Sequence, residues 1–181
     1  GPLLDLADRL GRFLGQTMDA GLKQVDCRFD GDYLPAQRHP LSVAALKGLL
    51  SIILEQTLSF INAPIFALER GIETSQSSAP APQEGYTRLL TVCAITDKGR
   101  QSVSGTITEN SEPRIVRLDS LCVDVSPRGR MLVIRNQDTP GIIGQVGMLL
   151  GENKINISDM RVGRQSLHGE AVMVITVDQD L

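Results

Sequence analysis

The segment from Leu41 to Leu54 limits the fold more than any other, because it is apolar on nearly every side when it is wound as a helix. Its one charged residue is Lys47. Pro40 suits the first turn of this helix, where a missing backbone N–H costs nothing. A helix without a polar face cannot lie on the surface of a domain. The segment therefore predicts a layered domain in which this helix is buried between the layers.

The remainder of the first domain is predicted to consist of helices packed on one face of an antiparallel sheet. Apolar residues recur at three- and four-residue steps from Leu3 to Met18 and predict an amphipathic helix, and a shorter helix is predicted over residues 62–70. The Ser/Ala/Pro-rich stretch from Thr74 to Gly85 is interpreted as a loop or linker. Partly alternating segments predict strands over residues 24–29, 89–95, 101–108, 114–118 and 122–125. We place this α+β domain at residues 1–126.

The order of elements changes after residue 126 to strand, helix, strand, strand. These elements are predicted over residues 131–136, 142–152, 156–163 and 170–178. The order is that of a ferredoxin-like domain, which we place at residues 127–181. A complete domain of this kind has one further helix and one further strand, so we expect this one to be truncated at its C-terminus. A sheet face and a strand edge would then be left for a partner subunit or a neighbouring domain to cover.

Composition argues against several classes of function. The 181 residues carry a net charge of −3 without a block of Lys and Arg, and 3% are aromatic, so no nucleic-acid partner is expected. No apolar run reaches the roughly 20 residues of a membrane span, and no segment resembles a signal peptide, so we expect no membrane partner and a cytoplasmic location. The three cysteines lie far apart and are interpreted as small core residues, Cys27, Cys93 and Cys122.

The sequence also gives little support to catalysis or cofactor binding in this chain. No Gly-x-Gly-x-x-Gly fingerprint opens a helix after a strand, so we expect no NAD site and no other cofactor here. His39 and His168 are well apart, which argues against a catalytic triad and against a zinc site. We therefore expect no catalytic residues, no metal and no enzymatic activity in this chain alone.

The segment from Ile134 to Ile157 carries the strongest indication of a ligand site. A strand ends in polar residues, turns at Pro140-Gly141 and opens a helix whose first N–H groups have no partner within the helix, which favours an anion. The carboxylate of an amino acid fits there, while Asp138 can accept from an ammonium group and Asn156 can both donate and accept. The same residues also suit an ordinary turn, helix cap and strand start, so chemistry alone leaves both interpretations open.

This segment resembles the ACT domain of the D-3-phosphoglycerate dehydrogenases. The similarity rests on four motifs, Asp138 to Gly151, Asn156-Ile157, Val162-Gly-Arg164 and Gly169 to Val174. Upstream motifs are similar to the intervening domain that longer members of the family carry before the ACT domain, and these are Pro40 to Leu50, Ile61 to Pro64 and Glu69 to Ile72. The resemblance covers essentially the whole chain. It points to the regulatory C-terminal portion of such an enzyme, without the catalytic and NAD-binding domains.

The resemblance implies a role in the regulation of L-serine biosynthesis. In the family, L-serine binds between two ACT domains, where the strand-to-helix loop of one chain and a strand start of the other contact it. The matching positions are Asn136, Asp138, Pro140, Gly141 and Ile142 in the loop, with Asn156 and Ile157 at the strand start. Self-association as a homodimer or larger oligomer is implied too, and NAD-dependent oxidation is implied for the parent enzyme.

Three further interpretations accompany this one. The intervening domain in the family can bind an anion, and the basic candidates here are Arg114, Arg128, Arg130 and Lys47. Arg114 falls at one such basic position of the family, whereas Arg128, Arg130 and Lys47 are better explained as solvated charges or buried aliphatic stems. Alternatively, the second domain is a structural oligomerisation module without an effector. The third interpretation is the regulatory part of an iron-sulfur L-serine dehydratase, which uses similar paired domains.

Overall fold

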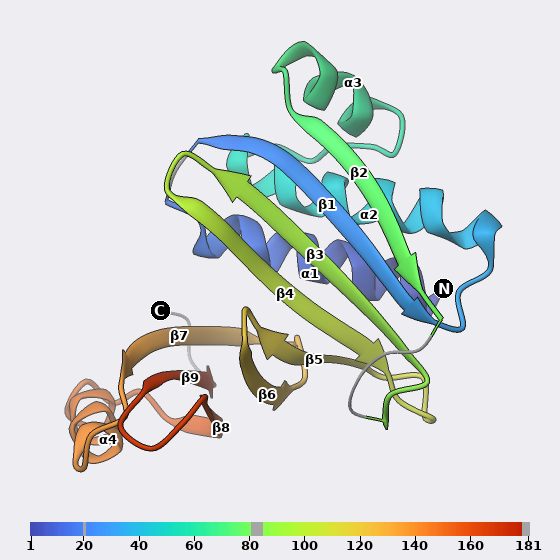
Figure 1. Ribbon diagram of the computed structural model, residues 1–181. Helices are drawn as coiled ribbons and strands as arrows, with labels where there is room; N and C mark the ends of the chain where they lie inside the picture. Colours follow the sequence, from blue (N-terminus) through green and yellow to red (C-terminus); the bar gives the residue numbers. More distant parts are fainter. Residues whose placement is uncertain (20, 81–84, 179–181) are drawn as a thin grey trace. The chain divides into compact units, whose positions relative to one another are not determined.

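A computed structural model of the chain describes residues 1–19, 21–80 and 85–178 (Figure 1). By their contacts the residues form two compact units, Gly1–Asp119 and Ser120–Leu181. The first unit contains α1 (Pro2–Thr17), β1 (Leu22–Gly31), α2 (Pro35–Ile53), α3 (Asn62–Glu69), β2 (Glu73–Ala79), β3 (Arg88–Thr96), β4 (Gly99–Ile107) and β5 (Pro113–Leu118). The second contains β6 (Leu121–Val125), β7 (Arg130–Gln137), α4 (Ile142–Glu152), β8 (Ile157–Arg164) and β9 (Glu170–Val177). The predicted α+β class is confirmed, whereas the domain boundary after residue 126 stays a prediction.

The first unit is built on a mixed sheet with two helices on one side. Within this unit the strand order is β2-β1-β3-β4-β5. The pairs β1–β3, β3–β4 and β4–β5 are antiparallel, whereas β1 and β2 run parallel to each other. Helix α1 packs against β3, β4 and β5, and α2 packs against β1. Both helices lie on the same side of this sheet (Figure 1).

Helices α1 and α2 come into backbone contact, and glycines make this possible. A Cβ atom at Gly11 of α1 would overlap the carbonyl oxygen of Ala45, and one at Gly48 of α2 would overlap the carbonyl oxygen of Asp8. Since neither glycine has a side chain, the two helices pack more closely than Leu-lined helices do. Large apolar side chains are buried on either side of this contact, including Leu6, Leu10, Leu14, Leu49 and Leu50.

The predicted loop from Thr74 to Gly85 is wrong in its first part, because β2 occupies Glu73–Ala79. This strand lies at the edge of the sheet, and residues 73–78 are exposed. Backbone hydrogen bonds to one neighbour hold such a strand, so it needs no large apolar side chains. The Ser-rich composition therefore gave no indication that this segment forms a strand. Residues 81–84 of the predicted loop lie outside the described residues.

The buried helix begins earlier than Pro40, which was predicted to lie in its first turn. Helix α2 starts at Pro35, and the side chain of Gln37 accepts a hydrogen bond of 3.0 Å from the Leu34 backbone N–H. Pro35 occupies the start of the helix, where proline is favoured. Pro40 consequently lies inside the helix and removes one of its backbone hydrogen bonds.

The second unit shows the predicted strand, helix, strand, strand order over β7, α4, β8 and β9. The three strands form an antiparallel sheet in the order β7-β9-β8, which is the order of a ferredoxin-like fold. Helix α4 covers one face through Leu150, which packs with Met173, Ile175 and Val177 of β9. The expected truncation of this domain stays a prediction.

Candidate functional site

The predicted ligand loop lines a cavity of about 270 Å³ in the second unit. Five predicted residues contribute to its wall, namely Asn136, Asp138, Pro140, Gly141 and Ile142. Ala171 and Met173 of β9 line it as well, together with Val162 and Arg164 of β8. The structure thus brings the loop half of the predicted site together around one cavity.

The sheet register explains why these residues meet at one end of the domain. Asn136 of β7 and Arg164 of β8 both pair with Ala171, which lies at the start of the central strand β9. Paired residues in an antiparallel sheet have their side chains on the same face. This face also carries Met173, which packs with Leu150 of α4. Two polar side chains therefore flank the start of β9 on the face that α4 covers.

The start of α4 contributes backbone N–H groups to the cavity. Gly141 precedes the helix with a φ of +91°, a left-handed conformation that glycine adopts without strain. No side chain caps the helix, so its first N–H groups are left for a ligand or for solvent. The backbone N–H of Asp138 donates to the carbonyl of Gly169 at 2.9 Å and holds the loop against the turn before β9. The helix start therefore favours an anion at the loop.

The cavity also contains opposite charges and an unpaired acceptor. Arg164 Nη1 lies 3.1 Å from Asp138 Oδ2, and the Arg164 side chain is 56% exposed while that of Asp138 is 26% exposed. The amide nitrogen of Asn136 donates to the carbonyl of Gln137 at 2.7 Å, whereas Asn136 Oδ1 is buried without a hydrogen-bond partner. Sequence reasoning missed Arg164 as a site residue, although the motif Val162-Gly-Arg164 was part of the family resemblance.

The other half of the predicted site, Asn156 and Ile157, lies at the opposite end of the same sheet. Ile157 pairs with Val177, and Asn156 Nδ2 donates to Asp178 Oδ2 at 2.5 Å. Val177 and Ala171 are six residues apart on β9, which corresponds to about 20 Å along a strand. Within one chain, the structure therefore does not bring Asn156 to the loop.

The four candidates for a second anion site are distributed over both units. Lys47 Nζ forms an ion pair with Asp8 Oδ1 at 2.6 Å and lies 5.5 Å from the centre of the Phe60 ring. Arg114 belongs to β5 of the first unit, whereas Arg130 begins β7 of the second and Arg128 precedes it. A carboxylate already engages the Lys47 ammonium, and the anion site stays a prediction.

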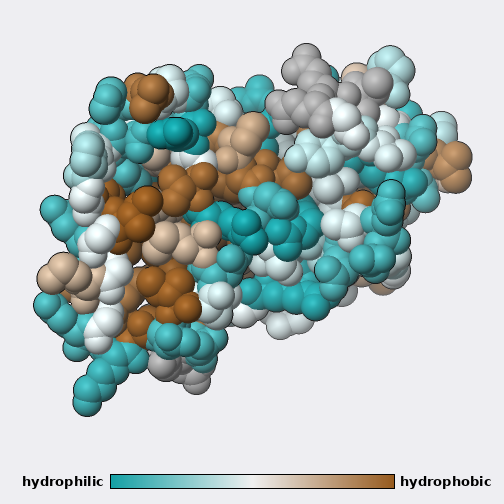
Figure 2. All heavy atoms as spheres, turned by 90° about the horizontal axis from the view of Figure 1, so that it is seen from below, coloured by the Kyte–Doolittle hydropathy of each residue, from teal (hydrophilic) through white to brown (hydrophobic). Residues whose placement is uncertain are grey.

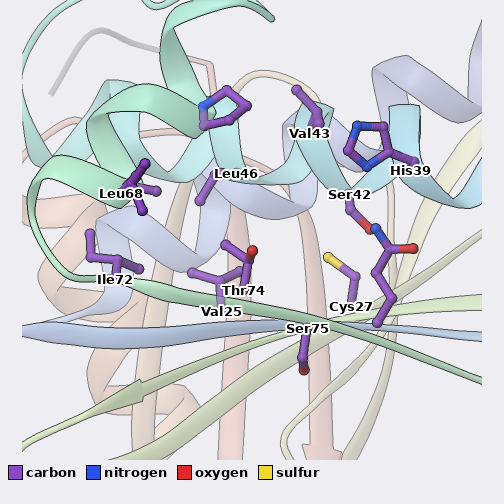
Figure 3. Close-up of a pocket in the computed structure, with 13 residues that line it drawn as sticks. Val25, Cys27, His39, Ser42, Val43, Leu46, Leu68, Ile72, Thr74 and Ser75 are labelled. Carbon is purple, nitrogen blue, oxygen red and sulfur yellow. The ribbon is translucent and has the colours of Figure 1, made fainter.

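A larger cavity of about 550 Å³ lies in the first unit between α2, α3, β1 and β2. In Figure 3, Cys27 and Ser42 face each other at one end of it, while Val25, Leu46 and Ile72 surround the other end. None of the residues that line it is Asp, Glu, Lys or Arg. Among the residues that line this cavity, the His39 imidazole is the group that can carry a positive charge toward a phosphate or an amino acid.

The three thiols are expected to differ in reactivity. Burial raises the pKa of the Cys27 thiol to about 12 and also raises the pKa of Cys93, whereas Cys122 is exposed. Because the thiolate is the reactive form, we expect Ellman's reagent at pH 8 to modify Cys122 rapidly and the two others only after unfolding in denaturant. The variant Cys122→Ser should lose the rapid phase. Rapid reaction of this folded variant would contradict the burial of Cys27 and Cys93.

Residues 1–19, 21–80 and 85–178 contain neither a metal-binding cluster nor a membrane-spanning helix. No group of three or more His, Cys, Asp or Glu side chains is arranged there to hold a metal ion. No helix in that part of the chain has the length and hydropathy of a membrane span.

Comparisons with known proteins match both units. The profile described as D-3-phosphoglycerate dehydrogenase intervening domain matches residues 1–119, and the ACT domain profile matches residues 130–181. The chain is 36% identical, over 99% of its length, to a D-3-phosphoglycerate dehydrogenase of Synechocystis and covers 32% of that protein. The protein of the same name from Methanocaldococcus jannaschii is 36% identical over 98% of the chain, which covers 33% of that protein. The one from Bacillus subtilis is 32% identical over 99% of the chain, which covers 34% of it. The chain thus spans about a third of the length of these relatives.

Proposed function

The chain belongs to the D-3-phosphoglycerate dehydrogenase intervening-domain family and carries an ACT domain, and on this premise we propose that it is the L-serine-sensing and oligomerisation part of such an enzyme. Its homology to the regulatory region of these dehydrogenases indicates a regulatory role. Under the proposal, NAD binding and oxidation of the substrate belong to other domains of the parent enzyme. The dehydrogenase names of the relatives favour this assignment over a serine dehydratase.

The observation that carries the proposal is the chemistry of the cavity beside the ligand loop. Asp138 provides a carboxylate for an ammonium group, and the uncapped start of α4 provides N–H groups for a carboxylate. The buried and unpaired Asn136 Oδ1 can accept a hydrogen bond from the ammonium or from a side-chain hydroxyl group. A volume of about 270 Å³ leaves room for a small amino acid such as serine.

Self-association would complete the site. Since Asn156 lies about 20 Å from the loop along β9, we propose that it reaches the effector from a second chain. Hydrophobic side chains, brown in Figure 2, lie at the surface among hydrophilic ones. On α4 the exposed hydrophobic residues are Ile143, Met148 and Leu149. Exposed apolar residues and open strand edges are surfaces that pairing of two such domains covers.

Regulation then follows from differential binding. An effector held between two chains stabilises the arrangement of chains in which both halves of its site meet. It changes the activity of a distant catalytic domain only if that domain has a different activity in this arrangement. The alternative function, an oligomerisation module without an effector, is favoured by one observation, which is that Asp138 already has Arg164 as its partner.

Calorimetric titration with L-serine tests the proposal. We expect saturable binding by the chain and a loss of at least about 100-fold in affinity for Asp138→Ala, because the ammonium group would lose the one carboxylate among the described residues that line the cavity. The matched control is Asp97→Ala, which removes an exposed carboxylate of the first unit that pairs with Lys23. This variant should bind as the unmodified chain does. Dimers that form without any heat of L-serine binding would support the oligomerisation module instead.

A further inference from the structure

Arg164 is the charged residue of the cavity to which the family resemblance assigned no role. We propose that it binds the carboxylate of the amino acid effector and makes the site specific for a zwitterion. This inference rests on the proposed function, namely that an amino acid binds with its ammonium group at Asp138. Under this inference, Arg164 recognises the second charged group of the ligand, its carboxylate.

The position of Arg164 follows from the sheet register. It pairs with Ala171 from the opposite side to Asn136, so both side chains flank the start of β9 on the same face. Asp138 lies two residues beyond Asn136, and its Oδ2 meets Arg164 Nη1 at 3.1 Å. The ion pair therefore joins the ligand loop to the end of β8 and places a negative and a positive group side by side in the cavity wall.

Both members of this ion pair retain capacity for a ligand. A guanidinium group has five N–H donors, and the described contact with Asp138 uses one of them. Asp138 accepts this contact through Oδ2, and the second carboxylate oxygen can receive an ammonium group. With a side chain that is 56% exposed, Arg164 can adjust toward a ligand, whereas the backbone of Asp138 is held by Gly169.

A zwitterion matches these two charges better than a ligand with a single charge does. The ammonium and carboxylate groups of an α-amino acid are attached to the same carbon, so they can lie antiparallel to the Asp138–Arg164 pair. The ligand carboxylate would then be shared between Arg164 and the first N–H groups of α4. An amine without a carboxylate neutralises Asp138 but leaves the guanidinium without a new partner. The site should consequently bind such an amine more weakly.

The test compares L-serine with L-serinamide, in which a neutral amide replaces the carboxylate. By calorimetry, the unmodified chain should bind L-serine at least about tenfold more tightly than L-serinamide, because bonds between charged groups are the stronger ones. Arg164→Gln should weaken L-serine binding about tenfold and leave L-serinamide binding within a factor of about two. Arg164→Lys, which keeps the charge without the planar fork, should recover part of the preference.

Arg161→Gln is the matched control. Arg161 lies on the same strand three residues earlier, on the opposite face, and pairs with Asp159 at 3.3 Å. Its removal lowers the net charge equally and should leave the preference for L-serine unchanged. The proposal for Arg164 is overturned if Arg164→Gln weakens both ligands equally, which indicates a structural role, or if it weakens neither. Failure of the unmodified chain to bind either ligand would refute the proposed function itself, and the role of Arg164 with it.

Discussion

Replacing Gly48 with alanine is expected to lower the free energy of unfolding of the first unit by about 3 kcal/mol. The new Cβ would overlap the carbonyl oxygen of Asp8, a backbone atom that cannot move unless α1 moves. In a helix interior, alanine is normally more stable than glycine by about 1 kcal/mol. A loss of stability can therefore come only from the overlap, and the sign of the effect reports on the contact between α1 and α2.

Urea unfolding followed by circular dichroism measures this effect. Gly11→Ala should be similarly destabilising, because the added Cβ on α1 would overlap the carbonyl oxygen of Ala45 on α2. The control is Gly147→Ala in α4, where no atom beyond the adjacent residues and the backbone of the helix itself lies within 4 Å of the added Cβ. That change should stabilise the chain by about 0.5–1 kcal/mol. If Gly48→Ala is as stable as the unmodified chain, the two helices do not pack in the way described.

The sequence contains a signal for this helix contact that the helix predictions did not use. Small residues recur every four positions in both helices, at Ala7, Gly11 and Gly15 in α1 and at Ala44 and Gly48 in α2. Positions four apart lie on one face of a helix, so each helix has a narrow stripe without bulk. The spacing predicts that another helix or strand packs closely against each stripe. It does not tell which two stripes face each other, because that depends on packing between segments far apart in the chain.

Elements in which apolar residues recur at regular intervals could be predicted from the sequence. Elements held in place by backbone hydrogen bonds could not. The apolar pattern around Leu41 to Leu54 correctly indicated a largely buried helix, although α2 packs on one side of a single sheet and not between two layers (Figure 1). The βαββ order was confirmed. Strand β2 was missed because its Ser-rich sequence shows no alternation, and its parallel partner β1 lies more than 40 residues earlier in the chain. Pairing of this kind is decided by the tertiary structure rather than by local propensity.

The candidate site shows the same division between local and long-range information. The loop residues from Asn136 to Ile142 could be predicted to lie together because strand end, turn and helix start are contiguous in sequence. Arg164 was missed because it meets Asp138 across 26 positions of sequence, through a register that only the folded sheet defines. Asn156 is the converse case, since the resemblance assigns it to a site that one folded chain does not complete.

Mixing two inactive variants is expected to restore L-serine binding. In a symmetric dimer whose sites combine the loop of one chain with Asn156 of the other, Asp138→Ala and Asn156→Ala should each abolish both sites. Co-refolding equal amounts of the two variants makes about half of the dimers mixed, and each mixed dimer holds one intact site. Calorimetry should then detect about a quarter of the sites of the unmodified protein. The distance of about 20 Å between the two halves in one chain is the reason for this expectation.

A second mixture separates this arrangement from a site made by one chain alone. When the double variant Asp138→Ala/Asn156→Ala is co-refolded with the unmodified chain, mixed dimers have no complete shared site, and again about a quarter of the sites should bind. If each chain formed its own site, the first mixture would recover no binding and the second would keep about half. The two mixtures contain the same numbers of substituted residues, so a difference between them cannot come from the substitutions themselves. Equal recovery in both mixtures requires that Asp138 and Asn156 act from different chains.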